Sequence, residues 1–462
     1  MNNQVHPASF RDPAGFLFTR QGVLYRQVNR SYQADYDLLV TSGLLDELVT
    51  RGMLVPSQEV DQAPELPDLA YKILRPEKIW FISYPYEWCF SQLKDAALRT
   101  LAIQRRALKK GMSLKDASAY NLQFQDGRLL LIDTLSFEAY QPGQPWVAYR
   151  QFCQHFLAPL ALMAHCDVRL EQLLRVYIDG IPLDLASRLL PLKTRLNPGL
   201  STHIHLHASF QKKHADSGIT TASRSGGMSL VALQGLIENL RNTIHGLKWR
   251  PRGTEWGEYY TESSGHYSES AAANKLAILE AFLDQVKPTS LWDLGANTGL
   301  YSRIASQRGI PSVAFDIDPA AVEQGYLQVK ADKETHLLPL VLDLTNPSPA
   351  IGWANRERMD LLARGPVDML LALALVHHLA IGNNLPLARI AEFFAQATQW
   401  LVIEFVPRED PQVQRLLSSR LDIFSGYNQA GFEAAFGEYF ELQQSRPVLE
   451  THRLMYLMKR RG

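Results

Sequence analysis

The fold of this chain is decided by one stretch of sequence, Ser290-Leu-Trp-Asp-Leu-Gly-Ala-Asn-Thr-Gly299. Apolar residues lead into Asp293, and two glycines then flank a short polar turn. We expect a buried strand that ends in this turn, because glycine lets the backbone come close to a ligand. A helical pattern follows at once over 300–308. The stretch therefore predicts a strand, a turn and a helix whose N-terminus is aimed at the same ligand.

A second strand is predicted directly after that helix, and acidic residues end it. The apolar run that begins at Ser312 leads into Asp316 and Asp318. Asp316 lies one helix and one strand after Asp293, where an acidic side chain can accept both hydroxyls of a ribose. The two strands together therefore predict a ligand that carries a ribose.

The spacing of the two glycines differs from that of two other nucleotide-binding motifs. Gly-x-x-x-Gly lacks the third glycine of the dinucleotide fingerprint, and no Gly-Lys-Ser/Thr follows as in a Walker loop. The segment 293–299 instead resembles the first motif of class I S-adenosylmethionine-dependent methyltransferases. The alternative is a turn with a purely structural role in another α/β fold.

The rest of the C-terminal half alternates between strand and helix patterns. Almost continuous apolar runs, as buried parallel strands require, occur at 367–375 and 399–406. Further strands are expected at 339–344 and 453–459, and a helix at 385–398. This alternation predicts an α/β fold with helices on both faces of a parallel sheet. The methyltransferase resemblance covers about 250–462 and implies a Rossmann-like, seven-stranded methyltransferase sheet.

The same resemblance implies where S-adenosylmethionine would bind. Asp316 would hold the ribose, and Asp343, at the end of a third strand, would contact the adenine amino group. The cofactor-binding residues that the resemblance implies are Asp293, Gly295, Ala296, Asn297, Gly299, Asp316, Ile317, Asp343, Leu344 and Ala374.

Three further residues belong to the sheet edge at which open α/β folds bind ligands. His377 and His378 closely follow one buried strand, and Glu404 lies near the end of the next. Either histidine can act as a general base toward the methyl acceptor, because the pKa of histidine is close to neutral. The alternative is that they pack or hydrogen-bond within the loop. Glu404 would contact the acceptor, or would only cap the following turn.

The N-terminal half contains a second cluster of candidate catalytic residues. An amphipathic helix over 92–110 is followed by a polar loop and by a hairpin with Asp126-Gly127 at its turn. This arrangement brings together Asp116, Asn121 and Asp133. Phosphoryl transfer needs an Asp to orient the attacking hydroxyl, and an Asn and a second Asp to hold magnesium. The spacing resembles the catalytic and metal-binding loops of the protein-kinase-like superfamily, which implies ATP and Mg²⁺ as ligands.

The N-terminal half also departs from the kinase pattern. Arg26, in a strand over 22–28, stands where a lysine is expected, and no glycine-rich loop precedes it. The resemblance places the strand that leads into the nucleotide hinge at 78–87, and Glu47 as the partner of the phosphate-binding lysine. Without that lysine the domain is either a kinase or a non-catalytic binding module. In a third interpretation, the acidic residues brace loops in an unrelated α+β domain.

Composition limits the classes of function. The chain has 462 residues, more than one core usually organises, and its 47 basic and 47 acidic residues cancel. RNA methylation is disfavoured because no surplus of positive charge attracts nucleic acid. Three cysteines without Cys-x-x-Cys spacing argue against disulfides and structural zinc. We find no signal peptide or apolar run long enough to span a membrane, so a cytoplasmic protein is expected.

Two other features have alternative interpretations. His203, His205 and His207 would share one face of a strand, as a zinc site or as a polar face. Aromatic residues before the first strand of the sheet would cover the cofactor or pack as ordinary core. These aromatic residues are Trp249, Trp256, Tyr259, Tyr260 and Tyr267, together with His266.

The predicted organisation is a kinase-like α+β domain at 1–195, a linker and bridging helix at 196–250, and a methyltransferase domain at 251–462. A segment rich in Ser, Thr and Gly at 216–227 marks the linker. This combination resembles bacterial kinase–methyltransferase fusions and nodulation-type methyltransferases. It implies methyl transfer to a small-molecule, glycan or lipid-linked acceptor, with no nucleic-acid partner.

Overall fold

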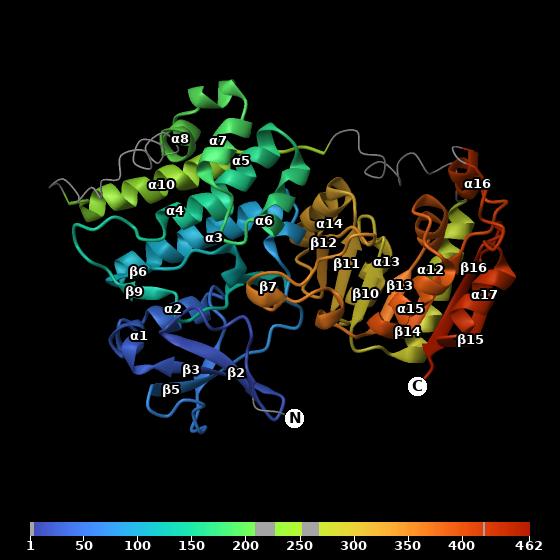
Figure 1. The fold of residues 1–462 in the computed structure, drawn as a ribbon, viewed down its shortest axis with the longest axis horizontal. Coiled ribbons are helices and arrows are strands. Elements are labelled where there is room, and N and C mark those ends of the chain that lie inside the picture. The colour runs from blue at the N-terminus through green and yellow to red at the C-terminus, as the bar shows by residue number, and fades with distance from the viewer. Residues whose placement is uncertain (1–3, 208–226, 252–267, 419–420) are drawn as a thin grey trace. The chain divides into compact units, whose positions relative to one another are not determined.

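The computed structural model describes residues 4–207, 227–251, 268–418 and 421–462 (Figure 1). Contacts divide the chain into two compact units. The first is Met1–Arg250 together with Ala350–Arg358, and the second is Pro251–Pro349 together with Met359–Gly462. This is a division by compactness, and the functional boundaries expected at 195 and 250 remain predictions.

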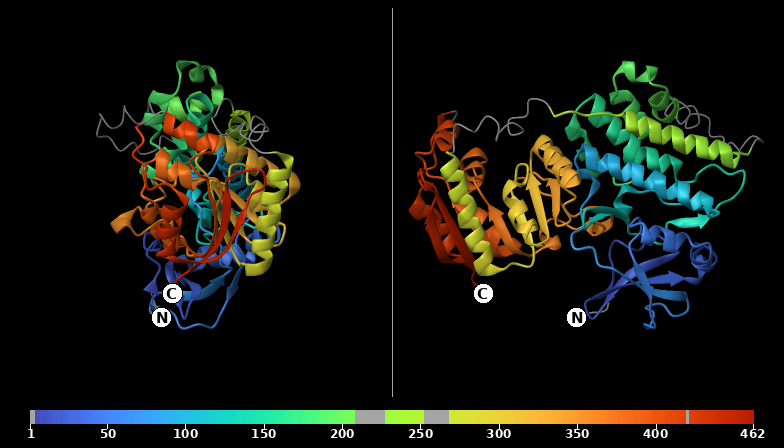
Figure 2. Two further views of the ribbon diagram at one scale, coloured as in Figure 1. Left: turned by 90° about the vertical axis from the view of Figure 1, so that its right-hand side faces the viewer. Right: turned by 180° about the vertical axis from the view of Figure 1, so that it is seen from behind.

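The second unit contains a seven-stranded sheet, as expected from the sequence (Figure 2). Its strand order is β12-β11-β10-β13-β14-β16-β15. The pairs from β12 to β14 are parallel, whereas β16 pairs antiparallel with β14 and with β15. The strands are β10 (Leu291–Leu294), β11 (Ser312–Asp316), β12 (Leu337–Val341), β13 (Val367–Ala372), β14 (Thr398–Phe405), β15 (Phe440–Pro447) and β16 (Leu454–Arg460).

Helices cover both faces of this sheet because alternate side chains of each buried strand point to opposite faces. On one face, Leu291 and Leu371 pack in one core cluster with Phe282 of α12. On the other face, Tyr456 contacts Phe432 of α17, with ring centroids 5.2 Å apart. The helices are α12 (Glu269–Val286), α13 (Leu300–Ser306), α14 (Pro319–Asp332), α15 (Leu387–Ala397), α16 (Pro411–Ser418) and α17 (Gln429–Gly437).

The order of the strands places a topological switch beside β10. The chain moves from β10 outward through β11 to β12, and then returns to β13 on the other side of β10. Ligands of open α/β sheets bind outside the carboxyl ends of the strands at such a point. The third predicted strand is shifted: β12 ends at Val341, so Asp343 lies in the loop that follows it.

The first unit begins with a five-stranded sheet in the order β1-β2-β3-β5-β4, and all its strand pairs are antiparallel. Arg26 lies on β3. The strands are β1 (Gln4–Val5), β2 (Gly15–Arg20), β3 (Val23–Asn29), β4 (Ser57–Glu59) and β5 (Ala70–Pro76), with α1 (Gln33–Thr41) and α2 (Leu44–Thr50) between β3 and β4.

A mainly helical part follows in the same unit. The amphipathic helix predicted at 92–110 is α3 (Phe90–Lys109), with Leu93, Leu101 and Leu108 buried. The hairpin is also confirmed: Asp126 and Gly127 both have positive φ, as a two-residue type I′ turn requires. The remaining elements include β6 (Met112–Leu114), β7 (Leu122–Gln125), β8 (Arg128–Leu131), β9 (Phe137–Ala139), α4 (Tyr149–Phe152), α5 (Ala158–His165), α6 (Leu173–Val176), α7 (Leu183–Leu189), α8 (Pro198–Leu200) and α10 (Leu230–Gly246).

Two sequence-based predictions of secondary structure in the first unit are wrong. The segment 78–87 is not a strand, and the last strand before α3 is β5. His203 and His205 lie in the helical segment η7 (Ser201–Leu206), which continues directly from α8. Residues two apart in a helix do not face one another, so the three histidines do not share a face.

The linker predicted at 216–227 lies, apart from Gly227, outside the described residues. Within the described ranges, no helix combines the length and apolar character needed to cross a membrane.

Candidate functional site

A cavity of about 610 Å³ opens at the carboxyl ends of β10 and β13, beside the topological switch. Every cofactor-binding residue predicted from the sequence lines it except Gly299. His378 also lines it, whereas His377 and Glu404 do not. The structure therefore brings most of the predicted site residues together around one cavity.

The glycine turn at the end of β10 approaches the cavity through its backbone. Gly295 has φ +75°, a conformation that strains other residues, and a Cβ there would lie 3.2 Å from Leu375 Cδ1. The amides of Gly295 and Ala296 both donate to the Phe315 carbonyl oxygen at 2.9 Å. Gly299 also has positive φ and immediately precedes α13, so its role is to shape the turn. The turn is held by β11, the neighbouring strand.

Asp316 braces the same turn from the end of β11. Its Oδ2 accepts a hydrogen bond from the Asn297 amide at 2.7 Å, and its Oδ1 accepts one from the Asp318 amide at 2.9 Å. Burial raises the pKa of Asp316 to about 6, although these amides favour its charged form. Asp316 therefore fixes the turn while it faces a cavity in which a ribose would find a carboxylate acceptor.

A network of buried charges lies next to the cavity. Glu404 is fully buried, and its Oε2 lies 2.6 Å from Lys275 Nζ. Its Oε1 lies 3.6 Å from Arg453, which also pairs with Asp410 at 2.7 Å. Lys275 Nζ also lies 4.7 Å from the centroid of the Tyr301 ring. The carboxylate of Glu404 thus contacts two cations inside the fold and does not line the cavity.

The paired histidines lie close together, with ring centroids 4.1 Å apart. Burial, and then the charge of Arg453, lowers the pKa of His378 to about 4. Burial, followed by the influence of His378 and Arg453, holds the pKa of His377 well below its usual value. Both imidazoles are therefore neutral at pH 7, and His378 presents a neutral ring to the cavity.

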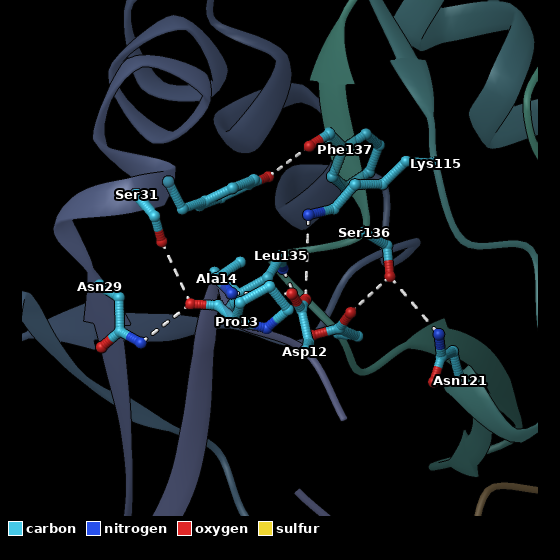
Figure 3. Close-up of polar contacts among 12 residues, drawn as sticks. Asp12, Pro13, Ala14, Asn29, Ser31, Lys115, Asn121, Leu135, Ser136 and Phe137 are labelled. Carbon is cyan, nitrogen blue, oxygen red and sulfur yellow. Dashed lines mark hydrogen bonds and ion pairs between the residues drawn. The ribbon is translucent and has the colours of Figure 1, made fainter. Parts of the chain in front are cut away.

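The candidate residues of the first unit also come together, and Figure 3 shows Asn121 beside Ser136 at this place. Asn121 Nδ2 donates to Ser136 Oγ at 3.4 Å, and Ser136 Oγ donates to Asp133 Oδ2 at 2.5 Å. Burial raises the pKa of Asp116, which is also affected by the charge of Asp133 and by a hydrogen bond to Asn121. Asp116, Asn121 and Asp133 thus form one connected polar cluster.

The prediction that Glu47 pairs with the basic residue on β3 is wrong. Arg26 forms an ion pair with Asp133, and Glu47 instead pairs with Arg106 and Arg51. Glu47 lies on α2, where Arg51 is its neighbour one helical turn on.

Comparison with known proteins connects the chain to a curated relative. No protein-family model matches the chain. It is 34% identical over 460 residues to the nodulation protein NoeA of Rhizobium meliloti (strain 1021), a match that covers 98% of this chain and 95% of that protein. The chain belongs to the NoeA family. The expected kinship with nodulation proteins is thereby confirmed at the level of the family.

Solved structures resemble part of this NoeA-family chain. A crystal structure of WbdD has a TM-score of 0.30 and 16% identity, and the match covers 47% of this chain and 46% of that one. The magnesium protoporphyrin IX methyltransferase ChlM from Synechocystis PCC 6803, with bound SAM, has a TM-score of 0.31 and 15% identity over 46% of this chain and 86% of that one.

Among the described cavity residues of this NoeA-family chain that sequence reasoning missed, Lys275 is the one with a buried charge. Lys275 is 2% exposed and is the one basic side chain among the described residues that line the cavity. It is the one basic residue of α12, and this was the available signal. Its partner Glu404 is far away in sequence, so the pattern of the helix alone could not reveal the pair.

The remaining sequence-based predictions concern aromatic residues and histidines. Trp249 packs near Phe90 with ring centroids 6.5 Å apart, and the other five aromatic and histidine residues of the predicted cover lie outside the described residues. His203 hydrogen-bonds with Tyr149 and Asn239. Across the described ranges, no group of three or more His, Cys, Asp or Glu side chains is arranged to hold a metal ion.

Proposed function

We propose that this NoeA-family chain is an S-adenosylmethionine-dependent methyltransferase that acts on a small-molecule, glycan or lipid-linked acceptor. The observation that carries the proposal is the cavity at the switch point, where Asp316, Asp343 and the backbone at Gly295 converge. Its volume of about 610 Å³ lies within the range of cofactor and small-molecule sites.

The lining offers a different chemistry for each part of such a cofactor. Asp316 would accept hydrogen bonds from the ribose hydroxyls, and Asp343 would accept one from the adenine amino group. Ile317 and Leu344 supply apolar surface beside them. The absence of a side chain at Gly295 leaves room beside Leu375 for the part of the cofactor nearest β10. These residues therefore fit an adenosine-bearing ligand.

The charges of the cavity also suit a cationic ligand. When bound, S-adenosylmethionine supplies an electrophilic methyl group on a positively charged sulfur. Glu269, Asp293, Asp316 and Asp343 line the cavity, against Lys275 as a basic side chain, which itself pairs with Glu404. Burial raises the pKa of Asp293 to about 7, so this carboxyl group is only partly ionised at pH 7. His378 is neutral because of its lowered pKa, so it adds no opposing charge. With a pKa of about 4 it is a weaker base than the near-neutral histidine expected from the sequence, so a role as general base would require the bound acceptor to raise this pKa. The chain would chiefly position the reactants and exclude water.

Methyl transfer can be tested without knowledge of the acceptor. The purified full chain would be incubated with methyl-labelled S-adenosylmethionine and with extract fractions enriched in small metabolites, glycans or lipids. Label should enter one fraction with the wild type and be lost with Asp316→Ala. If no fraction is labelled and calorimetry detects no cofactor binding, the proposal is wrong.

A second function is suggested for the first unit by the cluster of Asp116, Asn121 and Asp133. Phosphoryl transfer uses these residue types together with a basic residue, and Arg26 on β3 offers one. We propose a kinase-like architecture whose transfer activity is weak or absent, because Arg26 replaces the lysine. The bifunctional kinase–methyltransferase is the alternative. Transfer of labelled phosphate from ATP by the full chain in the presence of Mg²⁺ separates the two.

A further inference from the structure

We infer that the guanidinium of Arg26 takes the place of a divalent cation beside Asp133 in the first unit, as a built-in positive charge that braces this cluster without metal. The inference rests on the kinase-like part of the proposed function. It is independent of the cavity in the second unit and of the methyl-transfer proposal.

The carboxylate of Asp133 is already engaged on both oxygens. Its Oδ1 accepts from Arg26 and from the Leu135 amide at 3.3 Å, and its Oδ2 accepts from Ser136 Oγ at 2.5 Å. Burial opposes the charged form of Asp133, but Arg26 and the Ser136 hydroxyl outweigh it and hold the pKa below its ordinary value. Asp133 is therefore an ionised side chain whose counter-ion is a residue of the same unit.

Magnesium does not fit this arrangement. Mg²⁺ requires nearly octahedral oxygen ligands at about 2.0–2.1 Å and usually takes one or two carboxylates plus phosphates. The Arg26 guanidinium lies at the oxygen that such an ion would use, and arginine does not lose its proton in proteins. A divalent ion would therefore have to displace a fixed positive charge from a carboxylate that is already neutralised.

The lysine near this pair is itself engaged with an acidic residue. Lys115 Nζ lies 3.8 Å from Asp12 Oδ2 and 4.7 Å from the centroid of the Tyr32 ring (Figure 3). Asp116 contributes a further carboxyl group, and its Oδ1 accepts from the Gln151 side chain at 2.8 Å. Arg26 and Lys115 are thus each balanced by an aspartate, so without metal neither is free to neutralise phosphate charge.

The Arg26–Asp133 pair instead ties the five-stranded sheet to the chain that follows β8. The side chain of Arg26 is 10% exposed and that of Asp133 is 17% exposed, so water screens the pair only weakly. Next to it, the Tyr32 hydroxyl donates to the Phe137 carbonyl oxygen at 2.7 Å and makes a second link between the same parts (Figure 3). A guanidinium in this position does what a bridging metal ion would do, and needs no ligand to do it.

The inference predicts that removal of Arg26 creates a metal site. Mn²⁺, used as the spectroscopic probe for Mg²⁺, would be titrated into the full-length wild type, Arg26→Ala and Arg26→Ala/Asp133→Asn, with ATP absent and then present. Binding would be measured by the electron paramagnetic resonance signal of free Mn²⁺. Arg26→Ala should bind Mn²⁺ at least about tenfold more tightly than the wild type, because a like charge no longer opposes the ion. The double variant should lose this gain.

Matched controls separate the charge effect from unfolding. Arg30→Ala removes an exposed arginine of the same unit and should leave the Mn²⁺ titration unchanged. Arg26→Gln keeps a hydrogen-bond donor for Asp133 and should gain Mn²⁺ affinity even if Arg26→Ala does not fold. Tight Mn²⁺–ATP binding by the wild type that Asp133→Asn abolishes would overturn the inference. A folded Arg26→Gln variant that binds Mn²⁺ no more tightly than the wild type would also overturn it. The affinity of the same variants for S-adenosylhomocysteine, measured by calorimetry, should equal that of the wild type. If neither the wild type nor the variants bind it, only the methyltransferase proposal is contradicted.

Discussion

Substitution of Asp316 by alanine should weaken binding of S-adenosylhomocysteine, the demethylated cofactor. The proposed carboxylate contact to the ribose hydroxyls is charge-assisted, and such hydrogen bonds contribute about 1.5–3 kcal/mol. The dissociation constant should therefore rise about 10- to 150-fold. Part of this loss of affinity would come from a less well-held turn, since Asp316 also accepts hydrogen bonds from the backbone amides of Asn297 and Asp318.

Two further variants separate the ribose contact from the bracing of the turn. Asp316→Asn keeps one acceptor oxygen but loses the charge, so its affinity should lie between those of the wild type and Asp316→Ala. Asp318→Ala removes the N-cap of α14 from the same loop, and Asp318 does not line the cavity. It should lower the unfolding temperature while affinity stays within about twofold of the wild type.

Isothermal titration calorimetry on the full chain provides the affinities, and thermal unfolding of each variant confirms that it is folded. Affinity of folded Asp316→Ala within twofold of the wild type would refute the assignment of this carboxylate to the ribose. An equal loss in Asp318→Ala would show that the loop as a whole, and not the ribose contact, determines the affinity.

Other predictions test the remaining parts of the site. Gly295→Val should abolish cofactor binding measured by calorimetry, since its backbone has φ +75° and a Cβ would reach a neighbouring leucine; wild-type affinity would contradict this. His378→Ala should slow methyl transfer about 10²–10⁴-fold at nearly constant cofactor affinity, whereas a parallel loss of both would indicate a structural role. Cofactor affinity should rise with pH through about 6 to 7 and level off above that, because binding favours the ionised forms of Asp316 and Asp293, whose pKa values burial raises to about 6 and about 7; Asp316→Asn should remove the part of the rise near pH 6. Lys275→Met should reduce unfolding free energy in denaturant by about 3–5 kcal/mol, because it leaves Glu404 with one cation fewer in a buried site. Glu404→Gln in the same chain should recover part of this loss, and strictly additive effects would contradict the coupling.

The glycine turn and the strands around it could be predicted because their signals are local. A fully buried strand such as β13 needs a continuous apolar run, and a turn with positive φ at Gly295 favours glycine. The hairpin turn at Asp126-Gly127 has the same kind of local cause. Where a few neighbouring residues determine the backbone, the sequence was sufficient.

The charge pairs could not be predicted, because they join residues far apart in the sequence. Glu404 lies at the expected sheet edge, but its carboxylate faces Lys275 and Arg453 inside the fold. Arg26 pairs with Asp133, whereas Glu47 had been expected as the partner of the basic residue on this strand. A pattern along the chain indicates which face of an element is buried, but not which distant charge it meets there.

The three alternating histidines show a different limit. A spacing of two fits one face of a strand, yet so short a run occurs equally in a helix. The preceding α8, capped by the Asn197 side chain that accepts the Leu200 amide at 3.1 Å, continues into η7. The start of the helix, some residues upstream, therefore determined the conformation of His203 and His205.

The most direct test of the central claim is a calorimetric titration of the wild-type full chain with S-adenosylhomocysteine. The cavity at the switch point predicts saturable binding to one site with a dissociation constant on the order of micromolar, about −8 kcal/mol. A folded protein that releases no binding heat, and shows no thermal stabilisation, at about 1 mM ligand would contradict the methyltransferase account.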